Sequence, residues 1–261
     1  MKKLTSILIL LAIGACSVWS QTAKEEILAD LNKCGGSYYA YTKNFPPQTK
    51  APKGYKPFYI SHYSRHGSRY LTKDTSYTRV TDIFNSAHKQ HVLTALGEDV
   101  YQRLQELMKE ASLRAGDLSL VGKRQHSDIA ERMFNTFPEV FKGSPFVSLR
   151  STVSLRCNMS MIYFGDKLKQ LNPNIQMDYD TGNKFMEYMN YMPPQGKAFK
   201  NDVTGPWVEE FRKFKLSHHH PERLMNSLFN DPQFILKHVN PVDLMGDLYS
   251  IASDIQDIEY N

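Results

Sequence analysis

The stretch FYISHYSRHGSR, residues 58–69, most constrains the fold of this 261-residue chain. Phe58, Ile60 and the neighbouring tyrosines suit a strand buried on both faces, which is typical of a parallel sheet. Two arginines and a histidine follow this strand directly. Because open α/β folds bind ligands at the carboxyl ends of their strands, we expect the basic turn to belong to a binding site.

Helical and strand patterns alternate through the first two thirds of the chain. The Thr-x-x-Glu spacing at Thr22 is that of a capping box and predicts a first helix, which the glycine pair at 35–36 ends. Helical spacing of apolar residues predicts helices over residues 78–90 and 95–115, and we expect both to cover a sheet.

The same alternation continues beyond this pair of helices. A helical pattern follows the turn LSLVG, the stretch at 146–152 alternates like a strand, and the helical spacing returns over residues 153–171. Strands that alternate with helices predict an α/β sheet. We therefore assign residues 21–175 to an α/β core.

The pattern changes beyond residue 172. Residues 173–206 are rich in proline, glycine, methionine and tyrosine, and helical segments follow at about 207–216, 221–229 and 241–257. We interpret residues 176–261 as an irregular, mostly helical cap on the core.

Residues 1–20 have the character of a secretory leader. Two lysines precede an apolar run that is too short to span a membrane, and small residues allow cleavage before Gln21. The sequence around Cys16 also resembles a lipobox, so the alternative is a lipid anchor at that cysteine. Either route predicts a periplasmic or secreted protein.

The composition excludes several classes of protein. Hydrophobic residues make up 41% of the chain and aromatic residues 12%, which is too apolar for a disordered or fibrous protein. The formal net charge of +5 falls by two when the lysines of the leader are removed. This charge is too small and too evenly spread to favour nucleic acid as a partner.

The residues of the basic turn favour phosphoryl chemistry. Arginine binds phosphate oxygens through two N–H groups and stays charged, while histidine can attack phosphorus. We therefore expect Arg65 and Arg69 to bind a phosphate and His66 to accept it as a phosphohistidine. The transferred group carries its charge on three oxygens, so a third cation is needed, and we prefer Arg156 to Arg150.

At these residues the chain resembles a known family. The pentapeptide RHGSR, residues 65–69, matches the RHGxR signature of the histidine acid phosphatases, the second branch of the histidine phosphatases. The pair Thr72 and Lys73 matches the Thr-Lys of the family's phytases, in which it is implied to bind substrate. Leu71 stands where those phytases usually have proline, which weakens this correspondence.

Two later blocks strengthen the resemblance. Residues 118–141 are similar to the family's Leu-Thr-x-x-Gly-x-x-Gln turn and the helix after it, and residues 149–164 are similar to its Ser-Thr-x-x-x-Arg-x-x-x-Ser block. The arginine of that block is the family's third phosphate ligand and falls on Arg156. Three blocks in order are a specific signal, whereas the pentapeptide alone is weak.

The resemblance implies a three-layer, phosphoglycerate mutase-like α/β core with a helical cap. The spacing is closest to the multiple inositol polyphosphate phosphatases, including secreted bacterial ones. It therefore implies hydrolysis of phosphomonoesters of inositol polyphosphates, such as phytate, through a phosphohistidine. No metal or other cofactor is expected, because the arginines neutralise the phosphate.

One departure leaves two alternatives open. The family's proton donor lies in a His-Asp or His-Ala-Glu motif, and neither occurs in this sequence. We therefore expect an N-terminal portion of a family member, without the C-terminal part of the core. Such a chain could instead be a catalytically incompetent fragment that binds phosphate. A phosphoglycerate mutase-like transferase is disfavoured by the leader and by the phytase-like residues Thr72 and Lys73.

Overall fold

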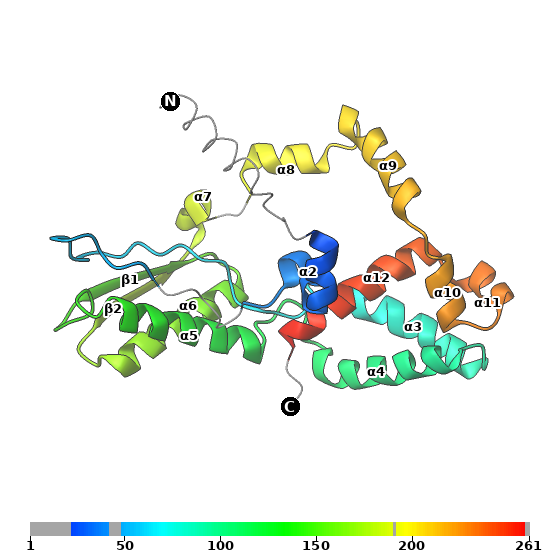
Figure 1. Ribbon diagram of the computed structural model, residues 1–261, viewed down its shortest axis with the longest axis horizontal. Helices are drawn as coiled ribbons and strands as arrows, with labels where there is room; N and C mark the ends of the chain where they lie inside the picture. The colour runs from blue at the N-terminus through cyan, green and yellow to red at the C-terminus, as the bar shows by residue number, and fades with distance from the viewer. Residues whose placement is uncertain (1–21, 42–47, 190–191, 259–261) are drawn as a thin grey trace, which may run out of the picture.

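The computed structural model describes residues 22–41, 48–189 and 192–258, and this part of the chain is mostly helical (Figure 1). The leader, with Cys16 and the cleavage position before Gln21, lies outside the described residues. The helices and strands are α2 (Ala23–Ala29), η1 (Leu31–Tyr38), α3 (Thr75–Lys89), α4 (Ala95–Ala111), α5 (Leu120–Thr136), β1 (Phe146–Ser151), α6 (Leu155–Leu171), β2 (Gln176–Thr181), η2 (Asn183–Phe185), α7 (Met186–Met189), α8 (Pro194–Asn201), α9 (Pro206–His218), α10 (Glu222–Leu228), α11 (Pro232–His238), α12 (Pro241–Asp254) and η3 (Ile255–Asp257).

One group of elements, which we call the sheet lobe, consists of α5, α6, β1 and β2. β1 pairs in parallel with β2, from Phe146 opposite Gln176 to Ser151 opposite Thr181, and α5 packs against α6 (Figure 1). Phe164, Leu168 and Ile175 are buried in its core. β1 was predicted from the sequence, whereas β2 lies where we expected irregular chain.

A second group, which we call the helical lobe, consists of α3, α4, α10, α11 and α12. The helices α3 and α4 pack against each other and against α12 and α10 (Figure 1). Their apolar stripes bury Phe84, Leu107 and Leu244 in one cluster. The two predicted helices therefore form, but the expectation that they cover a sheet is wrong, because their apolar faces meet other helices.

The predicted strand over residues 58–64 is also wrong. This stretch has no strand pairing among the described residues, and the side chain of Phe58 is 91% exposed. A strand buried on both faces needs a paired neighbour and a covering layer, and the described residues supply neither here. The parallel sheet thus has two strands in place of the expected three-layer core.

The basic turn connects the two lobes. Gly67 packs so closely against α5 that a Cβ atom on it would lie 2.5 Å from the carbonyl oxygen of Gly122. A few residues later, Tyr70 and Leu71 are buried in the cluster of the helical lobe. Glycine is thus required at position 67 by this contact with α5, which we had not predicted.

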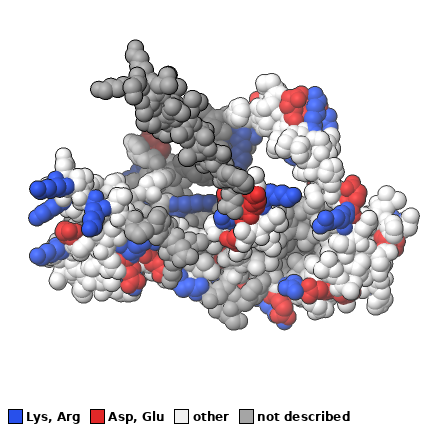
Figure 2. All heavy atoms as spheres, in the orientation of Figure 1, with Lys and Arg blue, Asp and Glu red and all other residues white. Residues whose placement is uncertain are grey.

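Charged side chains are spread over the surface. Figure 2 shows basic and acidic residues interspersed on the face in view, in keeping with the small net charge. No helix within the described ranges is long and apolar enough to cross a membrane.

Candidate active site

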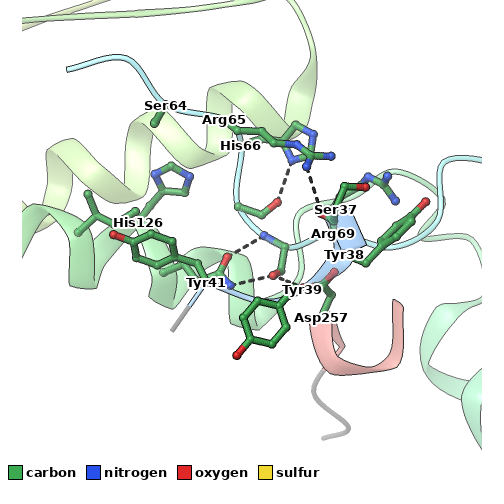
Figure 3. A pocket seen from close by; sticks show the side chains of 14 residues that line it. Ser37, Tyr38, Tyr39, Tyr41, Ser64, Arg65, His66, Arg69, His126 and Asp257 are labelled. Atoms are coloured by element: carbon green, nitrogen blue, oxygen red, sulfur yellow. Dashed lines mark hydrogen bonds between the residues drawn. The ribbon is translucent and has the colours of Figure 1, made fainter. Parts of the chain in front are cut away.

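A cavity of about 230 Å³ lies at the basic turn (Figure 3). Four segments distant in sequence contribute to its wall: the end of η1, the basic turn, the first half of α5 and the last described turn, η3. The lining residues are Ser37, Tyr38, Tyr39, Tyr41, Ser64, Arg65, His66, Gly67, Ser68, Arg69, Gln125, His126, Ile129 and Asp257.

His66 presents one ring nitrogen to the protein. Its Nδ1 lies 2.8 Å from the carbonyl oxygen of Gly67. A carbonyl oxygen only accepts hydrogen bonds, so Nδ1 carries the proton and the lone pair is on Nε2. Burial, together with the nearby positive charges of Arg156, Arg65 and Arg69, lowers the pKa of His66 to about 4, and the bond to Gly67 opposes this shift. At neutral pH the imidazole is uncharged and Nε2 can act as a nucleophile.

Arg65 and Arg69 both line the cavity with His66. The Nη1 of Arg65 donates to the carbonyl oxygen of Ser37, 3.2 Å away. The Nη1 of Arg69 donates to the carbonyl oxygen of Tyr70 at 2.9 Å, and its guanidinium lies over the ring of Tyr38. Each guanidinium is thus held in place by one or two contacts and keeps further N–H donors, because arginine has five.

Arg156 and Arg150 differ in what their guanidiniums contact. Arg156, at the start of α6, is close enough to His66 to lower its pKa, and its Nε is buried with no hydrogen-bond partner within the described ranges. Arg150 donates instead to the backbone of Leu149 and to the backbone and carboxylate of Asp178. The charge of Arg156 thus acts on His66, although Arg156 is not among the residues that line the cavity, and Arg150 is bound to the sheet.

Thr72 and Lys73 are not brought into the cavity. Both side chains are exposed, just before α3 begins, and neither lines the cavity. The resemblance had implied that they bind substrate.

Two carboxylates of the C-terminal segment lie behind the basic turn. Asp254 is fully buried, with one oxygen 3.8 Å from Nη1 of Arg69 and the other accepting from the hydroxyl of Tyr77 at 3.1 Å. Burial raises the pKa of Asp254 to about 7, although Arg69 and the Tyr77 bond oppose it. Burial likewise raises the pKa of Asp257, against the Ser68 bond and the charges of Arg69 and Arg65.

Sequence reasoning missed several residues of this site. The tyrosines of the η1 end and the two aspartates carry no motif that would mark them. Gln125 could have been found, because it is the glutamine of the Gly-x-x-Gln turn quoted above. His126, the next residue of the same block, is 4% exposed, and burial lowers its pKa to about 4.

The site holds no arrangement typical of a metal centre. No group of three or more His, Cys, Asp and Glu residues in the described part of the chain is placed to bind a metal ion. Among the described residues, the cavity wall brings together the imidazoles of His66 and His126, the guanidiniums of Arg65 and Arg69, and the carboxyl group of Asp257.

Solved structures share much of this fold. The chain superposes on the crystal structure of Bifidobacterium longum multiple inositol polyphosphate phosphatase in complex with inositol hexasulfate with a TM-score of 0.67 and 15% identity, covering 86% of this chain and 62% of that one. The fold is that of part of a histidine phosphatase. The apo form gives a TM-score of 0.63 at 15% identity, covering 81% and 58%, and the phosphate complex gives 0.62 at 14% identity, covering 81% and 57%.

The chain spans about three fifths of the length of the solved structures it matches. Neither a protein-family model nor a curated protein sequence matches it.

Proposed function

We propose that the chain is a histidine-type phosphomonoester hydrolase with His66 as nucleophile and Arg65, Arg69 and Arg156 as phosphate ligands. The observation that carries this proposal is an uncharged imidazole, with its lone pair on Nε2, in a cavity that Arg65 and Arg69 also line and near enough to Arg156 for that charge to lower its pKa. The unpaired, buried Nε of Arg156 supports it further, because a buried donor without a partner is costly unless a ligand satisfies it.

The proposed reaction has two steps. Nε2 of His66 attacks phosphorus, and the electron pair of the broken P–O ester bond goes to the leaving oxygen, which takes up a proton. Water then attacks the phosphohistidine, which releases inorganic phosphate and restores the imidazole. The arginines stabilise the charge on the three equatorial oxygens in both steps, as phosphoryl transfer requires.

We propose inositol polyphosphates as the substrate class. Support comes from the fold, which is similar to an enzyme of that name solved with inositol hexasulfate and with phosphate. The three-layer core of that family is likewise our proposal for the complete fold. From the leader sequence we also propose export to the periplasm or the exterior.

A non-catalytic phosphate-binding role is the second candidate. Neither the His-Asp nor the His-Ala-Glu motif of the family's proton donor occurs within these 261 residues. General acid help is worth about 10² to 10⁴ in rate, and a chain without it could still bind phosphate through its arginines.

The test compares wild type with His66→Ala, using calorimetry for the binding of inorganic phosphate and of inositol hexakisphosphate, and phosphate release for turnover. We expect the variant to lose turnover by at least about 10³-fold and to keep its phosphate affinity, because the cations remain. The control is His220→Ala, at an exposed histidine. Binding without turnover in wild type would favour the second candidate, and absence of both would refute the proposal.

A further inference from the structure

Ser68, the fourth residue of the RHGSR pentapeptide, uses all its polar groups to hold the basic turn. Its backbone N–H donates to Oε1 of Gln125 at 2.8 Å. Its carbonyl oxygen accepts from the backbone N–H of Ser119 at 2.9 Å and from the Ser119 hydroxyl at 3.0 Å. Its hydroxyl oxygen contacts both Nε2 of Gln125, at 2.8 Å, and Oδ1 of Asp257.

The direction of these bonds follows from the donors available. The Ser68 backbone can only donate to Gln125, so the Gln125 amide turns its oxygen there and its NH₂ group to the Ser68 hydroxyl. The hydroxyl has one proton, and because Gln125 donates to it, that proton is left for Asp257. A carboxylate at position 257 is therefore the acceptor that completes the chain of bonds.

The same peptide unit reaches His66. The Ser68 N–H and the Gly67 carbonyl belong to one planar peptide group, so holding one holds the other. The Gly67 carbonyl accepts from Nδ1 of His66. A continuous path of hydrogen bonds thus links Asp257, Ser68 and Gln125 to the tautomer of His66 (Figure 3).

We propose that Asp257 is a positioning residue that acts through Ser68 and Gln125 to hold the Gly67–Ser68 peptide, and thereby keeps the His66 lone pair on Nε2. The consequence for catalysis rests on the proposed function, whereas the positioning itself does not. Asp257 is 5% exposed and is separated from Ser68 by 189 residues, so this contact depends on the docking of α12 and η3 beside the turn. Of the described residues lining the cavity, Asp257 alone carries a carboxyl group.

Without the carboxylate, the Ser68 hydroxyl loses its acceptor and is free to turn away from Gln125. The Gly67–Ser68 peptide then rotates more freely, and the Gly67 carbonyl no longer selects the Nδ1–H form. The imidazole would divide between its two tautomers, one of which has a protonated Nε2 that cannot attack phosphorus.

The test is ¹⁵N NMR of the imidazole nitrogens at neutral pH in the full chain, with Asp257→Ala, Ser68→Ala and the double variant. We expect one Nδ1–H tautomer for His66 in wild type and a mixture of tautomers in each single variant. The double variant should show the same ratio of His66 tautomers as either single variant, because both substitutions break the same chain of hydrogen bonds. The control Asp243→Ala removes an exposed carboxylate from α12 and should leave the wild-type pattern.

Phosphate affinity is the second measurement. A misplaced loop should weaken the binding of inorganic phosphate by about 10- to 100-fold in Asp257→Ala and in Ser68→Ala. If Asp257→Ala fails to fold, Ser68→Ala tests the proposal, because it removes the hydroxyl that donates to Asp257 and leaves the carboxylate in place.

Three outcomes would overturn the proposal. The first is a folded Asp257→Ala or Ser68→Ala variant in which His66 keeps the wild-type tautomer. The second is a double variant whose effect equals the sum of the two single effects. The third is an Asp257→Ala variant that keeps the tautomer and is slower only with alkyl phosphates, which would make Asp257 a general acid. A wild type that binds no phosphate would refute the proposed function, while the NMR result would still decide the positioning role.

Discussion

The helical lobe gathers its core from two distant parts of the chain, residues 70–111 and 225–258, whereas the sheet lobe draws on the continuous stretch 130–175. The larger cluster belongs to the helical lobe, and its last helix, α12, and the η3 turn that follows bring Asp254 and Asp257 to the basic turn. The sheet lobe supplies Gly122, Gln125 and Ser160, which contact the turn from the other side.

This difference shows how the site depends on both lobes. The sheet lobe positions the backbone of the turn through residues of α5 and α6, which are 57 and 93 positions away in sequence. The helical lobe can do its part only after α12 has closed against α3, a contact between residues far apart in sequence. Damage to the two lobes should therefore have different effects on the site.

The largest effect should come from cavities in the two cores. Leu244→Ala in the helical lobe and Leu168→Ala in the sheet lobe each remove a fully buried side chain and should lower the free energy of unfolding by about 2–5 kcal/mol. Urea denaturation measures both. We expect Leu244→Ala also to weaken phosphate binding, because α12 carries Asp254 and leads directly into η3 with Asp257. A larger loss of phosphate binding in Leu168→Ala would contradict this view of the lobes.

The next largest effect should come from Gly122→Ala. A Cβ atom there would lie 2.2 Å from the carbonyl oxygen of Ser68, so α5 and the basic turn must separate. Overpacking of this kind costs about 1–3 kcal/mol, and phosphate affinity should fall with it. The matched control is Gly246→Ala in α12, where a Cβ meets nothing within 4 Å and should stabilise by about 0.4–1 kcal/mol. Equal effects at the two glycines would argue against the close contact.

A smaller effect on binding should distinguish the two arginines at the sheet lobe. Arg156→Ala removes a cation near His66 and should weaken phosphate binding about tenfold, which corresponds to one charged hydrogen bond. Arg150→Ala should leave binding unchanged, because that guanidinium is occupied by Asp178 and Leu149. Calorimetry with inorganic phosphate measures both, and the reverse order would assign the third cation to Arg150.

The smallest effect should be on the pH dependence of the free energy of unfolding. Burial lowers the pKa of His126 to about 4 from an ordinary value of about 6.5, so the unfolded chain takes up this proton first as the pH falls. As the pH falls from 6.5 to 4, His126 and His66 therefore decrease the free energy of unfolding. Asp254, with its pKa raised to about 7, increases the free energy of unfolding as the pH falls below 7.

The melting temperature of His126→Asn isolates one of these contributions. The difference in melting temperature between wild type and this variant should become smaller as the pH falls from 6.5 to 4. The exposed control His220→Asn should show no such trend. A gap that widens on acidification would contradict the sign of the His126 shift.

The sequence by itself determined what depends on near neighbours. The capping box at Thr22 forms as expected, with the Thr22 hydroxyl accepting from the Glu25 backbone, because its partners are three residues apart. Most of the predicted helices formed near their expected bounds, since their spacing and caps are local. The end of the first helix was wrong, because α2 ends at Ala29 and the glycine pair lies inside η1. The RHGSR stretch placed Arg65, His66 and Arg69 together for the same reason, and the block resemblance singled out Arg156.

Only the tertiary structure decided which surfaces meet. Residues 58–64 have the composition of a buried strand but remain exposed, because strand formation requires partners that local sequence does not contain. The apolar stripes of α3 and α4 specify burial and leave open whether a sheet or other helices bury them. The contacts of Ser68 with Gln125 and Asp257 join residues 57 and 189 positions apart, and such contacts arise from chain closure and not from any local pattern.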